Sequence, residues 1–595
     1  KQKTAYEIRL SLVGSEMCIR DRYILGLNAF HGDSSACILK DGKVIVALEE
    51  ERIRRIKHWA GFPTEAIKYC LKDAGISIKD IDHITISRDP SANVIKKIKH
   101  TLKNKISFST ILDRYTNSKK VKSVKAMLAE EFGIAEAEIK AEIHNVEHHR
   151  SHLGSSFFAS PFEKSALLSI DGFGDFTSTM TAIGNGNQIE ILDAVHFPHS
   201  AGIFYTSFTQ YLGFPKYGDE YKVMGLAPYG KPLYVDKLKD VIEFTSDGLF
   251  KLNLKYFKHH KDGVKMSWEG GEPDIESIFS EYMVEKFGPA RKREDELTQY
   301  HKDLASSVQR ICEELIFHIL THLHKRCGTD NLCIAGGVAQ NSVANGKVLK
   351  NTPFKNVYIP PAGHDAGTSM GSALFLYNHI LKQKRVEPTY SGALGSHFTD
   401  QEIEEYLIAQ KVKFSKYSDE ELYDKVTDCI IDAGVVGWFQ GRAEFGPRAL
   451  GHRSIIADPR RADAKEILNL KIKRRESFRP FAPSILKEFV PDYFADADDV
   501  PFMEKVYLIK EEMRSKIPAV THVDGTGRLQ SVNSEYEPKY HALISAFNKK
   551  TGVPILLNTS FNENEPIVNS PANALDCFLR TKMDMLVIEN YIVSR

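Results

Sequence analysis

Apolar residues in the first part of the chain form short runs that predict buried strands. The run "YILGLNA" starts at Tyr23, and two β-rich runs follow on either side of Asp41-Gly42, a dipeptide typical of a two-residue hairpin turn. The segment "FPTEAIKYCLKDAG" then has helical spacing and ends on glycine, and "DHITIS" returns to strand character. The predicted order is therefore β-β-β-α-β.

A similar order recurs in the middle of the chain. The runs "SALLSI", "STMTAIGN" and "QIEILDAVHF" predict strands, and a long amphipathic helix covers about residues 297–326. Two further runs, "NLCIAGG" and "NVYIPP", predict strands after that helix. Two such halves indicate an internally duplicated α/β unit with a cleft between the copies, and two unrelated α/β segments are the alternative.

A Pro/Gly/Ser-rich stretch, "VEPTYSGALGSHFTD", marks a linker at residues 386–400. The helix pattern "SDEELYDKVTDCIIDAG" and the strand "VVGWFQ" follow it, so we expect one domain at residues 23–385 and another at 401–595. Residues 1–22 lack an apolar signal-peptide core and contain a piece that looks like a library-adapter artefact. We expect them to be a non-native leader.

Composition narrows the class of partner. The formal net charge of +1 predicts neither a nucleic acid nor a membrane surface as the main partner. The eight cysteines form no C-x-x-C pair, so neither a zinc ribbon nor a redox dithiol is indicated, and their apolar settings suit a reducing cytosol. No apolar run approaches the roughly 20 residues of a membrane span. We therefore expect a cytoplasmic protein.

The stretch "HNVEHHRSHLGSS" places four histidines within nine residues. If it is helical, His144, His148 and His152 share one face, with His149 beside it, and two imidazoles one turn apart can hold a metal ion. The alternative is a polar helix start whose histidines only cap the helix and meet solvent.

Acidic residues and glycine-rich turns follow the apolar strands of the first domain. Asp171 ends "ALLSI" and enters "DGFGD", and Asp365 follows "VYIPPAGH". Carboxylates at the carboxyl ends of strands point into the crevice where α/β sheets bind ligands, and glycine-rich turns let backbone N–H groups approach phosphate. With the histidine pair, these aspartates would form an N2O2 set suited to Zn²⁺ or Fe²⁺, provided that the chain brings them together.

Basic residues are concentrated in two runs of the second domain, "GRAEFGPRALGHRSIIADPRR" and "KIKRRESFRPFAP". Guanidinium groups bind phosphate oxygens bidentately, and an apolar, proline-containing framework favours a pocket for them. A nucleic-acid patch is the alternative, but the aromatic residues of a stacking platform are missing. The polar residues Arg528, Asn558 and Ser560 could complete a phosphate or triphosphate pocket. The basic residues of the two runs include Arg442, Arg448, Arg453, Arg460, Arg461, Lys473, Arg474, Arg475 and Arg479.

Seven runs together resemble one known family. They are "EEERIRRIKH", "GDEYKVMGLAPYG", "GGVAQN", "GHDAGTSMGSA", "FGPRALGHRSIIADPR", "FRPFAPS" and "LNTSFN". From about Tyr23 to the end, the chain resembles the O-carbamoyltransferases of the NodU/CmcH type, whose relatives modify antibiotics, Nod factors and polysaccharide sugars. The combination of runs is specific, although each run alone is not.

The resemblance implies an α/β protein that works in two steps. An N-terminal domain of the duplicated actin/sugar-kinase (ASKHA) type would transfer a carbamoyl group to an acceptor hydroxyl. A C-terminal YrdC-like α/β domain would first make carbamoyl-adenylate from carbamoyl phosphate and ATP, with Mg²⁺, and release pyrophosphate.

The resemblance also implies roles for individual residues. In the N-terminal domain, Fe²⁺ or another divalent transition metal would be held by His148, His152, Asp171 and Asp365. Adenylate contacts would come from Gly202, Gly337 and Asn341, and Lys57 in "RIKH" would lie near the transferred group. In the C-terminal domain, carbamoyl phosphate would be held by Arg448, Arg528 and Asn558. The nucleotide phosphates would be held by Lys473, Arg479 and Ser560.

The first hairpin departs from the family pattern. Relatives commonly have adjacent His-Asp, whereas here Gly32 separates His31 from Asp33. An unperturbed imidazole has a pKa near 6.5 and suits the removal of the acceptor's proton. We therefore expect His31 to be the base and Asp33 to orient it, with Asp33 or water as the alternative base.

The expected partners are carbamoyl phosphate, ATP and a hydroxyl-bearing small molecule or glycan, with a homodimer left open. No membrane partner and no nucleic-acid partner are expected. Two other functions remain as alternatives: a tRNA-modifying enzyme of the threonylcarbamoyl type, and a non-catalytic nucleotide-binding sensor.

Overall fold

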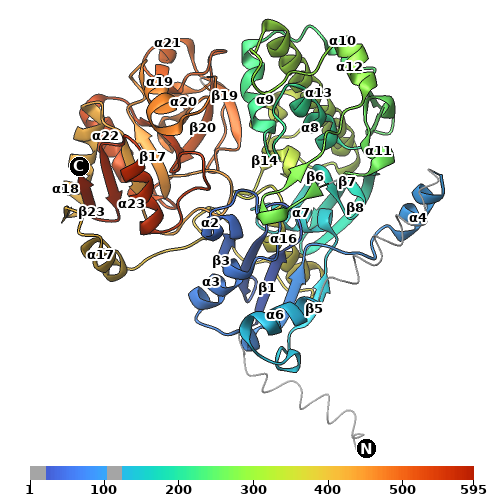
Figure 1. Ribbon diagram of the computed structural model, residues 1–595, viewed down its shortest axis with the longest axis horizontal. Coiled ribbons are helices and arrows are strands. Elements are labelled where there is room, and N and C mark those ends of the chain that lie inside the picture. Colours follow the sequence, from blue (N-terminus) through green and yellow to red (C-terminus); the bar gives the residue numbers. More distant parts are fainter. Residues whose placement is uncertain (1–21, 104–122, 265, 477, 595) are drawn as a thin grey trace, which may run out of the picture.

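A computed structural model describes residues 22–103, 123–264, 266–476 and 478–594 of the chain (Figure 1). The expected non-native leader lies outside the described residues, except for Arg22. In Figure 1, strands and helices gather into three bodies, with the N-terminal sheet in blue, a second sheet and its helices in green, and the C-terminal part in orange and red. Within the described residues, no helix has both the length and the apolar character needed to cross a membrane.

The first body is a five-stranded sheet with the strand order β3-β2-β1-β4-β5. The hairpin between β2 and β3 turns at Asp41 and Gly42, whose φ angles of 50° and 85° suit a two-residue turn, as predicted. A helix, α3 (Thr64–Ala74), packs on the sheet and ends at Gly75. The strands are β1 (Tyr23–Asn28), β2 (Ser35–Lys40), β3 (Lys43–Glu49), β4 (His83–Ile86) and β5 (Glu142–Asn145).

The second body repeats this sheet. Its order is β14-β13-β6-β7-β8, with two antiparallel neighbours on one side of the central strand and two parallel neighbours on the other, as in the first sheet. The predicted internal duplication is therefore confirmed, and with it the actin/sugar-kinase-like class of α/β fold. The strands are β6 (Lys164–Gly174), β7 (Thr177–Asn185), β8 (Gln188–His196), β13 (Asn331–Ala335) and β14 (Asn356–Tyr358).

Three helices build the second body's apolar core. The predicted long helix is α13 (Gln299–Cys327), whose buried stripe includes Leu304, Val308 and Ile311. It packs beside α8 (Ala201–Tyr211) and α9 (Glu220–Leu226).

Two small-residue helices join the two sheets at the centre of the molecule. They are α7 (His148–Phe157) and α16 (Gly367–Phe375). A Cβ atom at Gly154 would lie 2.4 Å from the carbonyl oxygen of Gly371, and a Cβ atom at Gly371 would lie 1.8 Å from that of Ser151. The helices thus pack backbone against backbone, which brings their first turns close together.

The third body is a nine-stranded mixed sheet with the order β15-β23-β22-β16-β17-β21-β18-β20-β19. Trp438 of the inner strand β16 is fully buried among apolar side chains. The strands are β15 (Phe414–Lys416), β16 (Val436–Phe439), β17 (Arg453–Ala457), β18 (Ala482–Leu486), β19 (Lys505–Leu508), β20 (Thr526–Val532), β21 (Ile555–Ser560), β22 (Met585–Ile588) and β23 (Tyr591–Ser594). The main helices are α17 (Asp400–Ala409), α18 (Asp419–Ile431), α22 (Pro538–Thr551) and α23 (Pro571–Arg580).

Residues 386–399, most of the predicted linker, form neither helix nor strand. The bodies on either side of this segment nevertheless contact each other directly. The α2 helix (Glu50–Arg54) and the residue after it reach loops of the C-terminal body. Arg52 Nη2 donates to the Gly446 carbonyl at 2.5 Å, and Arg55 Nη1 donates to the Ile567 carbonyl at 2.7 Å. These contacts fix the first hairpin region against the C-terminal body.

Candidate functional site

The histidine stretch divides between a strand and a helix. The prediction that His144 shares a helical face with His148 and His152 is wrong, because His144 lies on β5 and α7 begins only at His148. Glu147 caps the helix by accepting from the backbone N–H of Arg150 at 2.8 Å, and Asp175 accepts from the N–H of His148 at 3.0 Å. Two caps at one helix end fix where the remaining imidazoles point.

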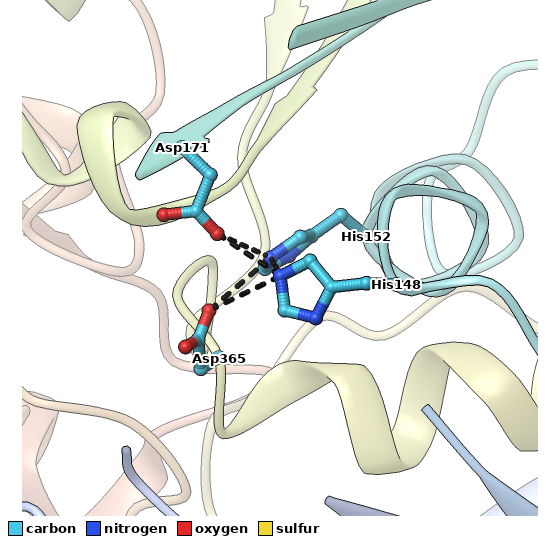
Figure 2. A group of neighbouring side chains, drawn as sticks. All are labelled: His148, His152, Asp171 and Asp365. Carbon is cyan, nitrogen blue, oxygen red and sulfur yellow. Dashed lines mark hydrogen bonds and ion pairs between the residues drawn. The ribbon is translucent and has the colours of Figure 1, made fainter. Parts of the chain in front are cut away.

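Four side chains converge at the start of α7 (Figure 2). The Nε2 atoms of His148 and His152 lie 3.1 Å apart, and both lie near Asp171 Oδ2, at 3.1 and 3.0 Å. Asp365 Oδ1 approaches the same two nitrogens at 3.6 and 3.4 Å. The predicted four residues are therefore brought together, from α7, from β6 and from the loop before α16.

Local backbone features explain this convergence. The pairing of β6 with β7 shifts register between Ile170 and Gly174, which releases Asp171 from the regular ladder. A Cβ atom at Gly174 would lie 2.0 Å from the His148 ring, so only glycine leaves room for that imidazole. Asp365 stands two residues before α16, whose glycine contact with α7 carries it toward the histidines.

The electrostatics of the four-residue cluster favour a cation. All four side chains are buried. Burial alone would lower the pKa of His152, but the neighbouring carboxylates of Asp171 and Asp365 raise that pKa to about 9. Burial alone would raise the pKa of Asp171, yet the two histidines hold it well below its usual value. Asp365 Oδ1 is buried and faces the two imidazole nitrogens, yet it accepts no hydrogen bond. A buried polar atom without a partner is rare in folded proteins, and a cation would give this oxygen one.

This donor set fits a divalent transition metal. Two imidazole nitrogens and two carboxylate oxygens are ligands that Zn²⁺ and Fe²⁺ accept, and a divalent metal would offset the charge of the two carboxylates. The fourth histidine, His149, is buried instead against Ser169 Oγ at 2.8 Å. Burial and the neighbouring histidines lower its pKa to about 3, so it stays neutral and supports the His148 ring from the side.

His31 lies beside the cluster, but Asp33 does not orient it. His31 Nδ1 is 3.2 Å from Asp365 Oδ2, and its ring stacks on His148 with centroids 4.9 Å apart. Asp33 Oδ1 instead bonds His58 Nδ1 at 2.7 Å. His58 belongs to the run "EEERIRRIKH", from which sequence reasoning selected only Lys57.

The glycine inserted between His31 and Asp33 has a packing reason. A Cβ atom at Gly32 would lie 2.4 Å from the Tyr217 hydroxyl oxygen. Burial and the nearby carboxylates Asp365 and Asp33 hold the pKa of Tyr217 well above its usual value, so its hydroxyl keeps its proton. Sequence reasoning missed Tyr217, although it directly precedes the run "GDEYKVMGLAPYG".

We predict that the Asp33–His58 ion pair stabilises the folded protein only within a defined pH window. Burial alone would lower the pKa of His58, but Asp33 raises it to about 9, and His58 in turn lowers the pKa of Asp33 against the effect of burial. The stability that His58 contributes to the folded protein is fully present below its unfolded pKa of about 6.5, and it is lost as pH rises through 9. The stability that Asp33 contributes is present above about pH 4, and it is lost as pH falls below that value.

Asp33→Asn should therefore lower the melting temperature at pH 5–6.5, and the difference from the parent should disappear by about pH 10. Thermal unfolding followed across this pH range measures the effect. The same substitution in a His58→Gln background is the control, where the pH-dependent difference should be absent. An equal decrease in melting temperature at pH 6 and at pH 10 would show that the loss of the ion pair is not the cause of the destabilisation.

Two of the three expected adenylate residues, Gly202 and Gly337, lie beside Asp171, and the third, Asn341, already has hydrogen-bond partners. The N–H of Gly337 donates to Asp171 Oδ1 at 3.1 Å, and a Cβ atom at Gly202 would lie 2.7 Å from the backbone nitrogen of Gly172. Asn341 bonds Gln309 at 2.9 and 3.0 Å and caps the next helix through the N–H of Ala344. The lack of a side chain at Gly202 and Gly337 lets their backbone approach Asp171 and Gly172 closely, whereas the Asn341 amide has protein partners.

A second group of residues forms a cationic cluster in the C-terminal body, which consists of Arg448, Arg479, Arg528 and Lys473. Burial and the charge of Arg479 lower the pKa of Arg448 to about 10, and burial and three arginines hold that of Arg528 well below its usual value. Among the described residues, no carboxylate forms an ion pair with Arg448 or Arg528. Half-buried guanidinium groups that repel one another favour an anion with several charges, such as a phosphate.

Neighbouring polar residues complete this cluster. Asn558 Nδ2 donates to the Ala449 carbonyl and to Ser484 Oγ, both at 3.0 Å, while its buried Oδ1 has no partner. Lys473 Nζ donates to Asn562 Oδ1 at 2.7 Å and lies 3.3 Å from Ser560 Oγ. Burial and nearby cations hold the pKa of Lys473 well below its usual value.

The cationic cluster lies at the interface with the N-terminal domain. The Arg479 guanidinium lies over the Tyr221 ring at 4.6 Å, and Lys222 Nζ is 3.5 Å from Glu476 Oε1, so α9 packs against the run "RRESFRPFAPS". Burial and the Arg479 charge lower the pKa of Lys57, although Glu51 opposes the shift. Lys57 therefore lies near Arg479, one of the residues expected to hold the nucleotide phosphates.

Comparison with known proteins gives matches over nearly the whole chain. The family descriptions Carbamoyltransferase N-terminus and Carbamoyltransferase C-terminus match residues 23–374 and 427–595. Uncharacterized protein sll1178 of Synechocystis sp. is 40% identical and covers 96% of this chain and 97% of its own. Nodulation protein NolNO of Sinorhizobium fredii is 39% identical and covers 96% of this chain and 80% of its own. Among solved structures, (R)-2-hydroxyglutaryl-CoA dehydratase component A of Acidaminococcus fermentans is 13% identical, has a TM-score of 0.32 and covers 60% of this chain and 98% of its own.

Proposed function

The chain belongs to the carbamoyltransferase family, and from that premise we propose that it is an ATP-dependent O-carbamoyltransferase with two separate reaction sites. In this proposal the cationic cluster makes carbamoyl-adenylate and the four-residue cluster at α7 is the site of transfer to a hydroxyl. The observation that carries the proposal is the pairing of these two unlike sites on one chain: one suits phosphates, the other a divalent metal.

At the C-terminal site, arginines would bind the charged groups of carbamoyl phosphate and ATP. The balanced reaction consumes both substrates and one water, and it yields carbamoyl-adenylate, phosphate and pyrophosphate. Negative charge accumulates where the two phosphate-bearing substrates meet. Arg448 and Arg528 are poised to offset it, because no described carboxylate already pairs with them.

At the N-terminal site, His148, His152, Asp171 and Asp365 would hold the metal, with Fe²⁺ as the expected ion. When bound, such a metal supplies Lewis-acid polarisation of the carbamoyl oxygen. His31 lies next to Asp365, where it can accept the proton of the attacking hydroxyl, and Asp365 Oδ2 can hold its ring in place. The Asp33–His58 pair and Tyr217 would shape the wall on which the acceptor rests.

The position of Lys57 between the two bodies supports internal transfer of the intermediate in this proposal. Lys57 follows the helix that contacts the C-terminal body, and it lies close enough to Arg479 and Lys473 for their charges to affect one another's pKa. Carbamoyl-adenylate hydrolyses readily, so a short protected route between the sites would limit its loss. The acceptor is a hydroxyl-bearing small molecule or glycan in this proposal.

The function is tested by incubating the protein with ATP and carbamoyl phosphate and measuring phosphate, pyrophosphate and AMP. Release of pyrophosphate only when carbamoyl phosphate is present is expected. Formation of ADP in place of AMP and pyrophosphate would contradict adenylate chemistry. A panel of sugars and oligosaccharides, scored for a mass gain of one carbamoyl group, then identifies the acceptor class.

We predict that His31→Gln slows transfer by about 10²–10⁴-fold, the usual contribution of a general base. Pyrophosphate release should stay within a few-fold of the parent rate, since His31 lies in the other domain. Asp33→Asn is the matched comparison, because it alters the same turn without touching the His31 imidazole. A transfer rate for His31→Gln within a few-fold of the parent would assign the proton to water or to Asp33.

A further inference from the structure

A second group of donor atoms lies on the edge of the first sheet, away from the four-residue cluster. His83 begins β4, and Glu142 and His144 lie on the neighbouring edge strand β5. The parallel register pairs His83 with Glu142 and Thr85 with His144, so all three side chains project from the same face of the sheet. Neither the proposed adenylation site nor the proposed transfer site uses them.

The donor atoms of these three residues converge on one point. His83 Nδ1 and His144 Nε2 lie 3.1 Å apart, and Glu142 Oε2 lies 3.8 and 3.6 Å from them. Two ligands placed about 2.0–2.1 Å from a zinc ion at tetrahedral angles lie roughly 3.3 Å apart. The observed separations are close to that value, and small movements of Glu142 would close the difference.

We propose that His83, Glu142 and His144 form a second metal site, selective for Zn²⁺ or a chemically similar divalent ion. Two imidazoles and one carboxylate are common zinc ligands and leave a fourth position for water. The Glu142 side chain is 70% exposed, so that position opens to solvent. The two histidine side chains are only 17% and 16% exposed, which limits their motion and keeps the nitrogens in place.

The protonation state of the pair supports metal binding. Burial and the neighbouring His144 lower the pKa of His83, and burial lowers that of His144 against the effect of Glu142. Both imidazoles are then neutral at pH 7 and have lone pairs to offer. A simple hydrogen bond between two neutral imidazoles is the competing explanation of the short nitrogen–nitrogen distance.

Zinc at this position would fasten the edge strand β5 to β4. After Asn145 the chain passes directly into α7, which carries His148 and His152. The site would therefore stabilise the strand that leads to the proposed transfer site, without contributing a ligand to it. We expect a rise in melting temperature when Zn²⁺ binds, because only the folded protein holds the three donors together.

The test is zinc stoichiometry on the full-length protein, measured by calorimetry and by the absorption of substituted Co²⁺. The parent should bind two equivalents, and His83→Ala and His144→Ala should each bind one. His541→Ala is the matched control, because His541 is similarly exposed and pairs with Glu488 elsewhere on the surface. The double variant His148→Ala/His152→Ala should lose the other equivalent, so failure of this site and of the proposed transfer site can be told apart.

Glu142→Gln is a second test variant in case the histidine variants do not fold. Its side chain is largely exposed, so the substitution should leave the fold intact. It should weaken the second equivalent at least about tenfold and remove the zinc-dependent rise in melting temperature. The site is refuted if His144→Ala binds as much zinc as the parent. It is equally refuted if Glu142→Gln leaves the zinc affinity unchanged, because the imidazoles would then form only a hydrogen bond.

Discussion

Replacing Arg528 with methionine is expected to lower the rate of pyrophosphate release at least about 10²-fold, the usual cost of removing one donor to a developing negative charge. Arg528 is a half-buried cation among other arginines, no described carboxylate pairs with it, and Arg448 adds its charge to the same place. Methionine keeps the length and apolar stem of arginine, so the loss would come from the missing guanidinium. The measurement is pyrophosphate formed from ATP and carbamoyl phosphate without acceptor.

The same substitution should not destabilise the fold. Arginines that repel one another in a half-buried place lower stability, so Arg528→Met should leave the melting temperature unchanged or raise it. Arg461→Met is the control, because Arg461 is another arginine of the C-terminal body but already pairs with Asp463 at 2.6 Å. Pyrophosphate release in Arg528→Met within threefold of the parent would remove this residue from the substrate site.

Asp365→Asn is expected to abolish transfer to the acceptor and to leave pyrophosphate release almost unchanged. Asp365 would be a metal ligand through Oδ1 and would hold His31 through Oδ2, so the substitution affects both the metal and the base. We expect a transfer rate lower by at least about 10³-fold, since a ligand contributes more than the 10–100-fold typical of the residues behind it. Metal content of the purified variant gives a readout that does not depend on activity.

The control for this variant is another buried aspartate of the same domain. Asp303→Asn removes a carboxylate that accepts from the N–H of Lys231, outside the four-residue cluster. It should retain both metal and transfer. If Asp365→Asn loses pyrophosphate release as well, the two reactions share one site and the division proposed here fails.

The order of the main elements could be predicted from the sequence because each element carries its own local signal. The Asp41-Gly42 turn, the glycine stop after α3 and the apolar stripe of α13 are properties of neighbouring residues. The duplication of the sheet followed from the repeated order of strands and helices. The duplicated α/β unit could therefore be predicted from local patterns, whereas its actin/sugar-kinase-like class came from the family resemblance.

The histidine stretch shows where a local signal fails. Periodicity alone allowed a helix from residue 144, but Glu147 and Asp175 cap the helix at His148, and Asp175 reaches that position from a distant turn. His144 then pairs with His83, which is 61 residues away in sequence. No pattern within the stretch could separate the strand histidine from the helix histidines.

The partner of Asp33 was missed for a similar reason. Adjacent positions suggested that Asp33 orients His31, yet φ is 57° at Asp33, in the left-handed region, and the carboxylate bonds His58 instead. The Gly32 contact with Tyr217 is also invisible in the sequence, because the two residues meet only after the chain has folded. The convergence of the four-residue cluster could be guessed from residue types, but its basis is the glycine contact between α7 and α16.

The central claim, that one chain makes carbamoyl-adenylate at one site and consumes it at another, is tested most directly by a single-turnover experiment. Asp365→Asn is mixed with ATP, radiolabelled carbamoyl phosphate and a sugar acceptor that the parent protein carbamoylates, quenched rapidly, and analysed for labelled carbamoyl-adenylate, pyrophosphate and labelled acceptor. The two-site account predicts that labelled carbamoyl-adenylate accumulates, with an equal amount of pyrophosphate and no labelled acceptor. Labelled acceptor formed in this variant, or an acceptor product formed by the parent without pyrophosphate, would contradict it.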